Sequence, residues 1–208
     1  MNLIERIYRA DQSRKSRFHT ASGVLCVNPF EVAYAATTTL SRAMFGVLVR
    51  RPWLVGKALP IIESRVPGAR VFEYGAGMST LWFSNKAAFV ASVESNAGWA
   101  ERLNAILTAE GRPPVVLRTD PEAYARQIES VEGSFDIILV DGINRRRCVE
   151  ECVPRLRKGG LLILDNTDVN TDLIPAALST ANFDVKQYSG YAPGVLHPNE
   201  TSVLTKLC

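Results

Sequence analysis

The sequence predicts an α/β protein with a doubly wound, mostly parallel sheet, and three observations support this fold class. Short apolar runs alternate with amphipathic segments from about residue 70 onwards. The runs lack polar alternation, as do strands that are buried on both faces of a parallel sheet. The last two runs are joined by a Gly/Pro-rich loop that is too short for a crossover helix, so they are expected to pair antiparallel.

The chain length and composition fit one compact domain. The protein has 208 residues, of which 47% are hydrophobic and 22% charged, and its net charge is +3. This charge is too small to indicate a nucleic-acid partner or a membrane surface. The cysteines form no C-x-x-C pair, and the first residues are too charged for a secretory signal. We therefore expect a cytoplasmic protein.

The first 66 residues are expected to form an arm and a cap, and residues 67–208 the main domain. Helices are predicted over Phe30–Val49 and Pro52–Val66, where they would cover the carboxyl edge of the sheet, at which such sheets bind ligands. The first helix carries two charged residues, which favours a packed helix over a membrane span. The arm has a basic cluster, which we interpret as solvated or loosely ordered: Arg6, Arg9, Arg14, Lys15 and Arg17.

Each expected strand is a short apolar run, and each expected helix between strands is an amphipathic segment. The strands, in order, are Val71–Tyr74, Phe89–Val93, Val115–Leu117, Phe135–Val140, Leu161–Leu164, Asp184–Tyr188 and Thr201–Thr205. The helices are Ser79–Lys86, Trp99–Glu110, Pro121–Ser130 and Arg145–Arg157.

Two glycines follow the first strand in the stretch VFEYGAGMST, residues 71–80. Gly75 and Gly77 allow a sharp turn and the close approach of a ligand to the backbone. Ser79 then opens a helix whose first N–H groups have no partner within the helix. A purely structural turn is the alternative. Glu94 follows the second strand about 20 residues later, where an acid can accept hydrogen bonds from ribose hydroxyls.

The choice between NAD and S-adenosylmethionine depends on two positions. Thr80 takes the place of the third glycine of a dinucleotide fingerprint. Glu73, at the strand end, would repel a pyrophosphate but suits a ligand with a cationic amine. S-adenosylmethionine carries an ammonium and a sulfonium and no phosphate, so the sequence favours it.

Four stretches in this order resemble class I S-adenosylmethionine-dependent methyltransferases: VFEYGAGMST, VASVESNAGWA, FDIILVDG and RKGGLLILDN. The resemblance covers about residues 70–205. It implies a Rossmann-like sheet of seven strands whose last strand is antiparallel, which agrees with the two final strands predicted above.

The resemblance also implies roles for individual residues. Glu73, Gly75 and Gly77 would shape the turn around the methionine part of the cofactor, with Ser79 beneath it. Glu94 would hold the ribose hydroxyls.

Further roles concern the adenine and the reacting methyl group. Ser95 would lie beside the adenine and Asp120 would bind its amino group, although Asp120 is equally suited to cap the helix that begins at Pro121. Asp141 would lie near the methionine end and the reacting methyl. Trp99 could stack on adenine or belong to the core.

Acidic side chains follow two neighbouring strands and suggest a metal site. Asp141, Asp165 and Asn166 offer three oxygen ligands at one sheet edge, which suits Mg²⁺. The pattern resembles the metal site of catechol and caffeoyl-coenzyme A O-methyltransferases. Those families have a lysine at the position of Asn144, and the segment between the two acids is a few residues longer there. A strand-end turn that needs no metal is the alternative for Asp165 and Asn166.

Two further groups are candidates for the chemistry of the site. His197, in the loop between the last two strands, could serve as a general base together with Asp141, or could be a surface histidine. The run Arg145–Arg147 is either a solvated face or an anchor for an anionic substrate.

The sequence therefore predicts methyl transfer from S-adenosylmethionine to a small molecule, at a hydroxyl oxygen. An NAD-dependent oxidoreductase and a non-catalytic cofactor-binding or oligomerisation module are the alternatives. We expect no nucleic-acid or membrane partner, and a homo-oligomer is compatible with the sequence.

Overall fold

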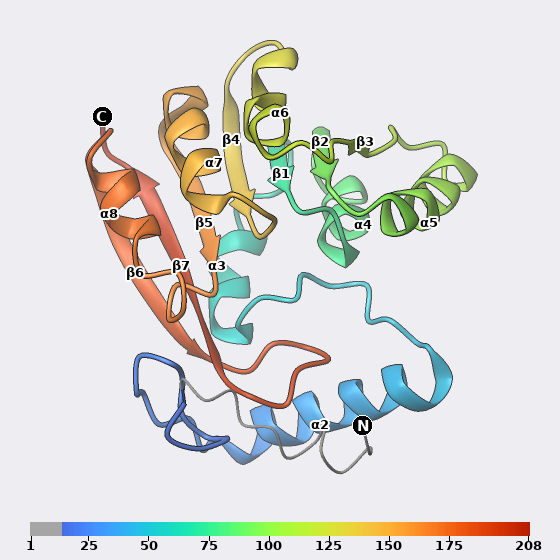
Figure 1. The fold of residues 1–208 in the computed structure, drawn as a ribbon, viewed down its shortest axis with the longest axis vertical. Coiled ribbons are helices and arrows are strands. Elements are labelled where there is room, and N and C mark those ends of the chain that lie inside the picture. The colour runs from blue at the N-terminus through green and yellow to red at the C-terminus, as the bar shows by residue number, and fades with distance from the viewer. Residues whose placement is uncertain (1–13) are drawn as a thin grey trace.

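The computed structural model describes residues 14–208 and confirms the predicted fold class (Figure 1). Seven strands form one sheet in the order β3-β2-β1-β4-β5-β7-β6. Strand β7 is antiparallel to both β5 and β6, as predicted, and the pairs from β3 to β5 are parallel. The strands are β1 (Arg70–Tyr74), β2 (Phe89–Glu94), β3 (Val116–Leu117), β4 (Phe135–Val140), β5 (Leu156–Asp165), β6 (Phe183–Gly190) and β7 (Asn199–Lys206).

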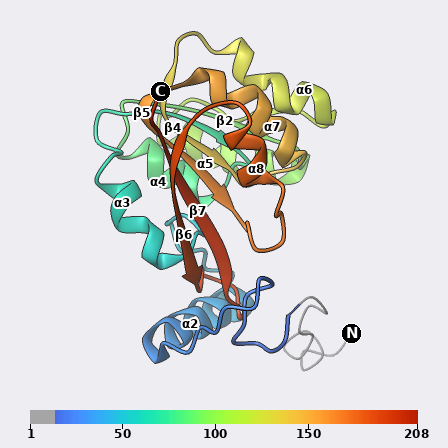
Figure 2. The same cartoon turned by 90° about the vertical axis from the view of Figure 1, so that its left-hand side faces the viewer.

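Helices cover both faces of the sheet (Figures 1 and 2). The α-helices are α2 (Pro29–Phe45), α3 (Leu59–Glu63), α4 (Met78–Ser84), α5 (Ala97–Ala109), α6 (Pro121–Ala125), α7 (Arg145–Cys152) and α8 (Leu173–Leu178). Short 3-10 helices are η1 (Gly56–Ala58), η2 (Arg126–Ser130) and η3 (Val153–Arg155). In the described chain, no helix is long and apolar enough to cross a bilayer.

Alternate residues of the central strands supply two apolar cores. Phe72 and Ile138 point to one face, where they pack with α6, α7 and α8. Val71 and Ile137 point to the other face, where α3 and α4 cover them. A strand that is buried on both faces needs apolar side chains at successive positions, which explains why these runs do not alternate with polar residues.

The predicted helix Pro52–Val66 is wrong over its first part. Residues 52–55 are not helical, and the chain becomes helical only at η1 and α3. The N–H of Val55 donates to Thr201 Oγ1 at 3.1 Å and that of Gly56 to the carbonyl oxygen of Tyr191 at 3.3 Å. Contacts with distant residues therefore replace the first helical hydrogen bonds.

The predicted helix Arg145–Arg157 also ends early. The α-helix ends at Cys152, and η3, which contains Pro154, leads directly into β5. Proline has no N–H to donate, which favours a helix end at this point. Strand β5 accordingly begins at Leu156, which pairs with Phe135 of β4.

Residues 14–45, here called the N-terminal segment, lie beyond the carboxyl ends of the parallel strands (Figures 1 and 2). The helix of this segment, α2, is at the bottom of both views. Arg14 donates to Asp168 Oδ2 at 3.2 Å and to Asn199 Oδ1 at 3.1 Å, and both side chains of the Arg14–Asp168 pair are buried. Thus the expectation of a solvated arm is wrong for Arg14. Arg6 and Arg9 lie outside the described residues.

Candidate functional site

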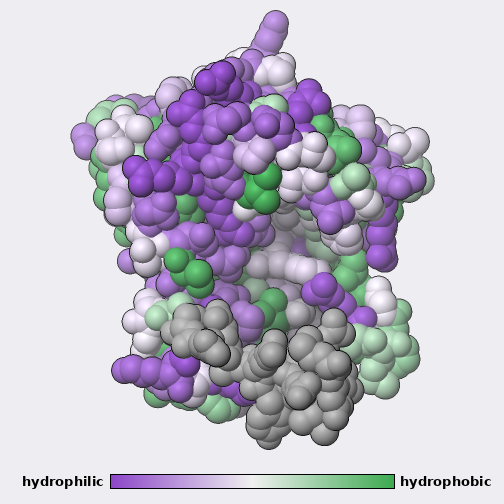
Figure 3. All heavy atoms as spheres, viewed as in Figure 1, coloured by the Kyte–Doolittle hydropathy of each residue, from purple (hydrophilic) through white to green (hydrophobic). Residues whose placement is uncertain are grey.

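A cavity of about 650 Å³ lies at the carboxyl ends of β1, β2 and β4. Its floor is the turn from Gly75 to Ser79, and its sides include the residues that follow β2 and β4. The end of α2 and the extended chain up to Trp53 form the remaining wall. Figure 3 shows this face hollowed between the body of the sheet and the N-terminal segment. The predicted cap therefore contributes to the cavity, but through residues 42–53 and not through α3.

The two glycines of the turn have different reasons to be glycine. Gly75 has a φ of 92°, and a Cβ there would lie 2.8 Å from the backbone of Asp141 and Gly142. Gly77 has extended backbone, and its Cβ would meet only Ser79 Oγ, at 3.7 Å. The fold itself requires the first glycine. Because Gly77 lines the cavity, its missing side chain provides space for a ligand.

Glu73 does not line the cavity, contrary to the expectation that it would face a ligand. Its carboxylate is fully buried beneath the turn, where Oε2 accepts hydrogen bonds from Thr80 and, at 2.9 Å, from Ser92. Thr80 Oγ1 in turn accepts the N–H of Gly77 at 2.9 Å. Burial raises the pKa of Glu73 to about 7, although the hydroxyl donors oppose this rise. Glu73 and Thr80 thus support the turn from below.

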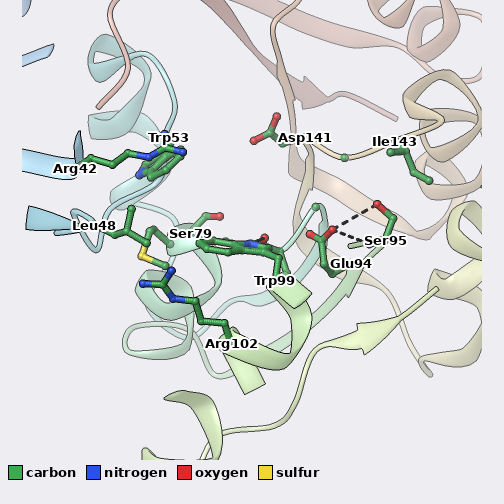
Figure 4. A pocket seen from close by; sticks show the side chains of 16 residues that line it. Arg42, Leu48, Trp53, Ser79, Glu94, Ser95, Trp99, Arg102, Asp141 and Ile143 are labelled. Carbon is green, nitrogen blue, oxygen red and sulfur yellow. Dashed lines mark hydrogen bonds between the residues drawn. The ribbon is translucent and has the colours of Figure 1, made fainter. Parts of the chain in front are cut away.

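Glu94, the last residue of β2, and Ser95, which follows it, both line the cavity. Glu94 Oε1 accepts hydrogen bonds from the N–H groups of Ser95 and Asn96, both at 2.7 Å (Figure 4). Oε2 accepts no hydrogen bond from the part of the chain that the structure describes. One oxygen therefore fixes the orientation of the side chain, and the other remains for a ligand.

Asp141 also lines the cavity, at the end of β4. Its Oδ1 accepts a hydrogen bond from Arg145 at 2.9 Å, and its side chain retains 32% exposure. Burial raises the pKa of Asp141, while the charge of the Arg145 guanidinium opposes this rise. The carboxylate is held in place and still reaches the cavity.

The predicted magnesium site does not fit the arrangement of its three residues. The carboxylate of Asp165 is buried and turned towards β7, where it accepts a hydrogen bond from Thr201 at 2.7 Å. Arg145 lies beside Asp141 and Asn166 and donates to a side-chain oxygen of each. Asn166 has a φ of 54°, in agreement with a strand-end turn. The structure thus favours the alternative without a metal. Within residues 14–208, no group of three His, Cys, Asp or Glu side chains could hold a metal ion.

Two further predicted site residues, like Glu73, lie outside the cavity lining. Asp120 caps α6, because its Oδ1 accepts the N–H of Ala123 at 2.8 Å. This supports the capping alternative and not the contact with adenine. His197 is half-buried in the loop between β6 and β7 and does not line the cavity, which gives the predicted general base no support.

Further side chains line the cavity, among them two tryptophans and two arginines. Trp99 is one of them, and its Nε1 donates to the carbonyl oxygen of Ala76 at 2.8 Å. The Arg42 guanidinium lies 4.7 Å from the Trp53 ring centroid, and that of Arg102 lies 5.8 Å from the Trp99 ring centroid. Sequence reasoning missed Arg42, Trp53 and Arg102. No local motif marks them, since their positions depend on how distant segments pack.

Figure 4 shows an asymmetric distribution of charge around the cavity. Arg42 and Arg102 lie on one side, together with Trp53. Asp141 and Glu94 lie on the other side. The site can therefore accommodate a ligand that carries an anionic group at one end and a cation or hydroxyl groups at the other.

No protein-family model and no curated protein matches the sequence. Among solved structures, a candidate O-methyltransferase from Klebsiella pneumoniae is similar, with a TM-score of 0.61 and 14% identity over 86% of this chain and 100% of that one. An rRNA methylase from Streptococcus thermophilus has a TM-score of 0.58 and 14% identity over 78% and 100% of the two chains. An S-adenosylmethionine-dependent O-methyltransferase from Thermotoga maritima has a TM-score of 0.54 and 16% identity over 82% and 71%.

At these identities the likeness concerns the fold. The strand order, the antiparallel β7 and the helices on both faces all agree with it. The chain has the seven-stranded, Rossmann-like fold of class I S-adenosylmethionine-dependent methyltransferases.

Proposed function

We propose that the protein is a methyltransferase that uses S-adenosylmethionine. One observation carries this proposal: the turn at Gly75–Gly77, the acid Glu94 and the acid Asp141 surround a single cavity at the carboxyl edge of the sheet. Such sheets bind nucleoside ligands at this edge. The similar solved structures include proteins described as methyltransferases, which adds support at the level of the fold.

The residues of the cavity suit S-adenosylmethionine. Glu94 Oε2 would accept hydrogen bonds from the ribose hydroxyls, and Ser95 would lie beside the adenine. Gly77 would leave room for the methionine part, whose carboxylate would pair with Arg42 or Arg102. Asp141 would face the positive charge of the sulfonium and the ammonium. The cofactor, when bound, supplies a methyl group on a sulfonium that is already activated for transfer.

We propose a small molecule as the acceptor, with a hydroxyl oxygen as the nucleophile. The wall that α2 and Trp53 form limits the space in front of the turn. Two tryptophans and two arginines line this cavity, which suits an acceptor that has an aromatic or anionic part. The residues contribute mainly by alignment of acceptor and methyl group, which is a large part of the catalysis that such a reaction needs.

Isothermal titration with S-adenosylmethionine, S-adenosylhomocysteine and NAD tests the cofactor. We expect both sulfur ligands to bind and NAD not to bind. Glu94→Gln should weaken binding of the sulfur ligands at least ~10-fold, because a buried charged hydrogen-bond acceptor is lost. Asp120→Ala is the matched control, since this acid lies outside the cavity, and its affinity should equal that of the wild type. Binding of NAD alone would contradict the proposal.

A transfer assay tests the acceptor. Purified protein with a methyl-labelled cofactor is incubated with a panel of hydroxylated aromatic compounds and, separately, with bulk RNA. Label on a small molecule is the expected result. Label on RNA alone would overturn the assignment of the acceptor and leave the assignment of the cofactor intact.

A further inference from the structure

Arg145 lies at the point where β4 and β5 end, and its side chain points inward. This distinguishes it from Arg146 and Arg147, which form ion pairs with acids at the surface of α7 and its neighbours. The Arg145 side chain is only 17% exposed. A charge run at a helix start is normally a solvated face, so the inward position of one member needs its own explanation.

The acceptors around Arg145 are all oxygens. Nε donates to the carbonyl oxygen of Gly142 at 2.8 Å. One terminal nitrogen donates to the carbonyl oxygen of Asp165 at 2.6 Å and to Asn166 Oδ1 at 3.2 Å. The other donates to the carbonyl oxygen of Asp141 at 3.1 Å and to Asp141 Oδ1 at 2.9 Å. These contacts join the ends of β4 and β5.

The number of contacts matches the chemistry of the side chain. A guanidinium has five N–H donors in a planar fork, and Arg145 makes five hydrogen bonds. No donor is left for an anionic acceptor, so the proposed anchoring of a substrate does not apply to Arg145. Instead the side chain donates hydrogen bonds to backbone and side-chain oxygens at the ends of β4 and β5, which would otherwise face one another without a donor between them.

The same oxygens are those that a hard divalent cation would need. Mg²⁺ binds oxygen ligands at about 2.0–2.1 Å and prefers near-octahedral geometry. Here Asp141 and Asn166 both face the guanidinium, and the Asp165 carboxylate faces Thr201 instead. A divalent ion at this place would have to displace a guanidinium that makes five hydrogen bonds. If it did not displace the guanidinium, the two cations would lie side by side and repel each other.

We infer that the Arg145 guanidinium is the fixed cation between the ends of β4 and β5 and that it excludes a divalent ion from the oxygens of Asp141 and Asn166. The strand ends are then held by a residue of the chain itself. The expectation that methyl transfer needs no metal rests on the proposed function. The expectation that no divalent ion binds at these oxygens can be tested without it.

The first experiment measures divalent-ion binding to the wild-type protein. Mn²⁺ is titrated with and without S-adenosylhomocysteine, and free Mn²⁺ is followed by electron paramagnetic resonance. We expect no bound Mn²⁺ that depends on Asp141, and no change of Tm with Mg²⁺. A single Mn²⁺ site in the wild type that Asp141→Asn removes would overturn the inference.

The second experiment asks which cation the site prefers. Arg145→Ala leaves a space lined by the same oxygens, and millimolar methylguanidinium should raise its Tm while Mg²⁺ should not. Arg146→Ala, on the same helix, is the matched control and should not respond to methylguanidinium. A folded Arg145→Ala protein that is stabilised by Mg²⁺ and not by methylguanidinium would contradict the inference. If this variant does not fold, the wild-type Mn²⁺ titration decides alone.

A third measurement connects the inference with catalysis. Methyl transfer should be unchanged by EDTA and by added Mg²⁺. Loss of activity in EDTA that Mg²⁺ restores would overturn the inference. Absence of methyl transfer under every condition would instead contradict the proposed function, and the binding experiments would still decide on the cation.

Discussion

Glu73 is buried below the glycine turn, and its ionisation costs free energy in that place. A carboxyl that has left water is stabilised in its neutral form, which accounts for a pKa of about 7 against an ordinary value of 4.5. Two hydroxyl groups donate to Oε2, whereas Oε1 has no hydrogen-bond partner among the described residues. The position therefore contributes to the turn by hydrogen bonding and not by charge.

Glu73→Gln tests this at the level of stability. Between pH 4.5 and about 7 the folded wild type keeps a proton that the unfolded chain has already released. The contribution of Glu73 to the free energy of unfolding should therefore be greatest below pH 4.5 and should be lost as the pH rises to about 7. Glutamine still accepts from the hydroxyl groups but does not titrate. Urea unfolding at several pH values should show the wild type losing up to ~3 kcal/mol relative to the variant over this range. Parallel pH profiles would contradict the assignment.

The turn between β1 and α4 combines a requirement of the fold with a requirement of the ligand. Gly75 lies against the backbone of the loop after β4, so the turn and that loop pack without any side chain between them. Thr80, in the first turn of α4, connects the N–H of Gly77 to Glu73 below. The turn is thus fixed from two sides and does not depend on a bound ligand for its shape.

A pair of alanine substitutions separates these two requirements. Gly75→Ala should lower the free energy of unfolding by ~3 kcal/mol or more, because the new Cβ meets backbone atoms at a positive φ. Gly77→Ala should change stability by less than ~1 kcal/mol and weaken S-adenosylmethionine binding at least ~10-fold. Thermal unfolding and isothermal titration measure the two effects. Equal loss of stability in both variants would be inconsistent with this division.

At the scale of the whole molecule, the N-terminal segment is attached to the sheet through Asp168. Its Oδ2 accepts from Arg14 and, at 2.9 Å, from the N–H of Ala21. Its Oδ1 accepts the N–H of Glu200 at 3.3 Å. The same segment continues into α2, whose end reaches the cavity at Arg42. The attachment at Asp168 therefore contributes to the placement of the cavity wall.

Asp168→Ala should weaken this attachment. Loss of one partner of a buried ion pair typically costs about 3 kcal/mol or more. Hydrogen exchange should increase over residues 14–28, and ligand affinity should fall. Asp172→Ala is the matched control, because this acid is half exposed and its ion pair with Arg146 is 4.0 Å long. Unchanged exchange in Asp168→Ala would show that the segment is held by other contacts.

The local pattern of residues determined most of the architecture. Apolar runs fixed the strands, and the short final loop fixed the antiparallel pair, because hydrophobic periodicity and loop length act locally. The placement of Gly75, Glu94 and Asp141 at strand ends followed for the same reason, since carboxyl ends of parallel strands share one edge.

Only the tertiary structure decided in which direction each side chain points and what it meets there. Glu73 is next to the last residue of β1, and Asp165 is the last residue of β5, so both lie near the same edge of the sheet. Nevertheless, the Glu73 side chain lies below the turn and the Asp165 carboxylate faces Thr201. Arg145 donates to the side-chain oxygens of Asp141 and Asn166, which the sequence pattern assigned to a metal ion. Arg42 reaches the cavity from a segment more than 30 residues before the glycine turn. Burial and cation position are properties of the packed molecule, because they depend on contacts between residues far apart in the chain.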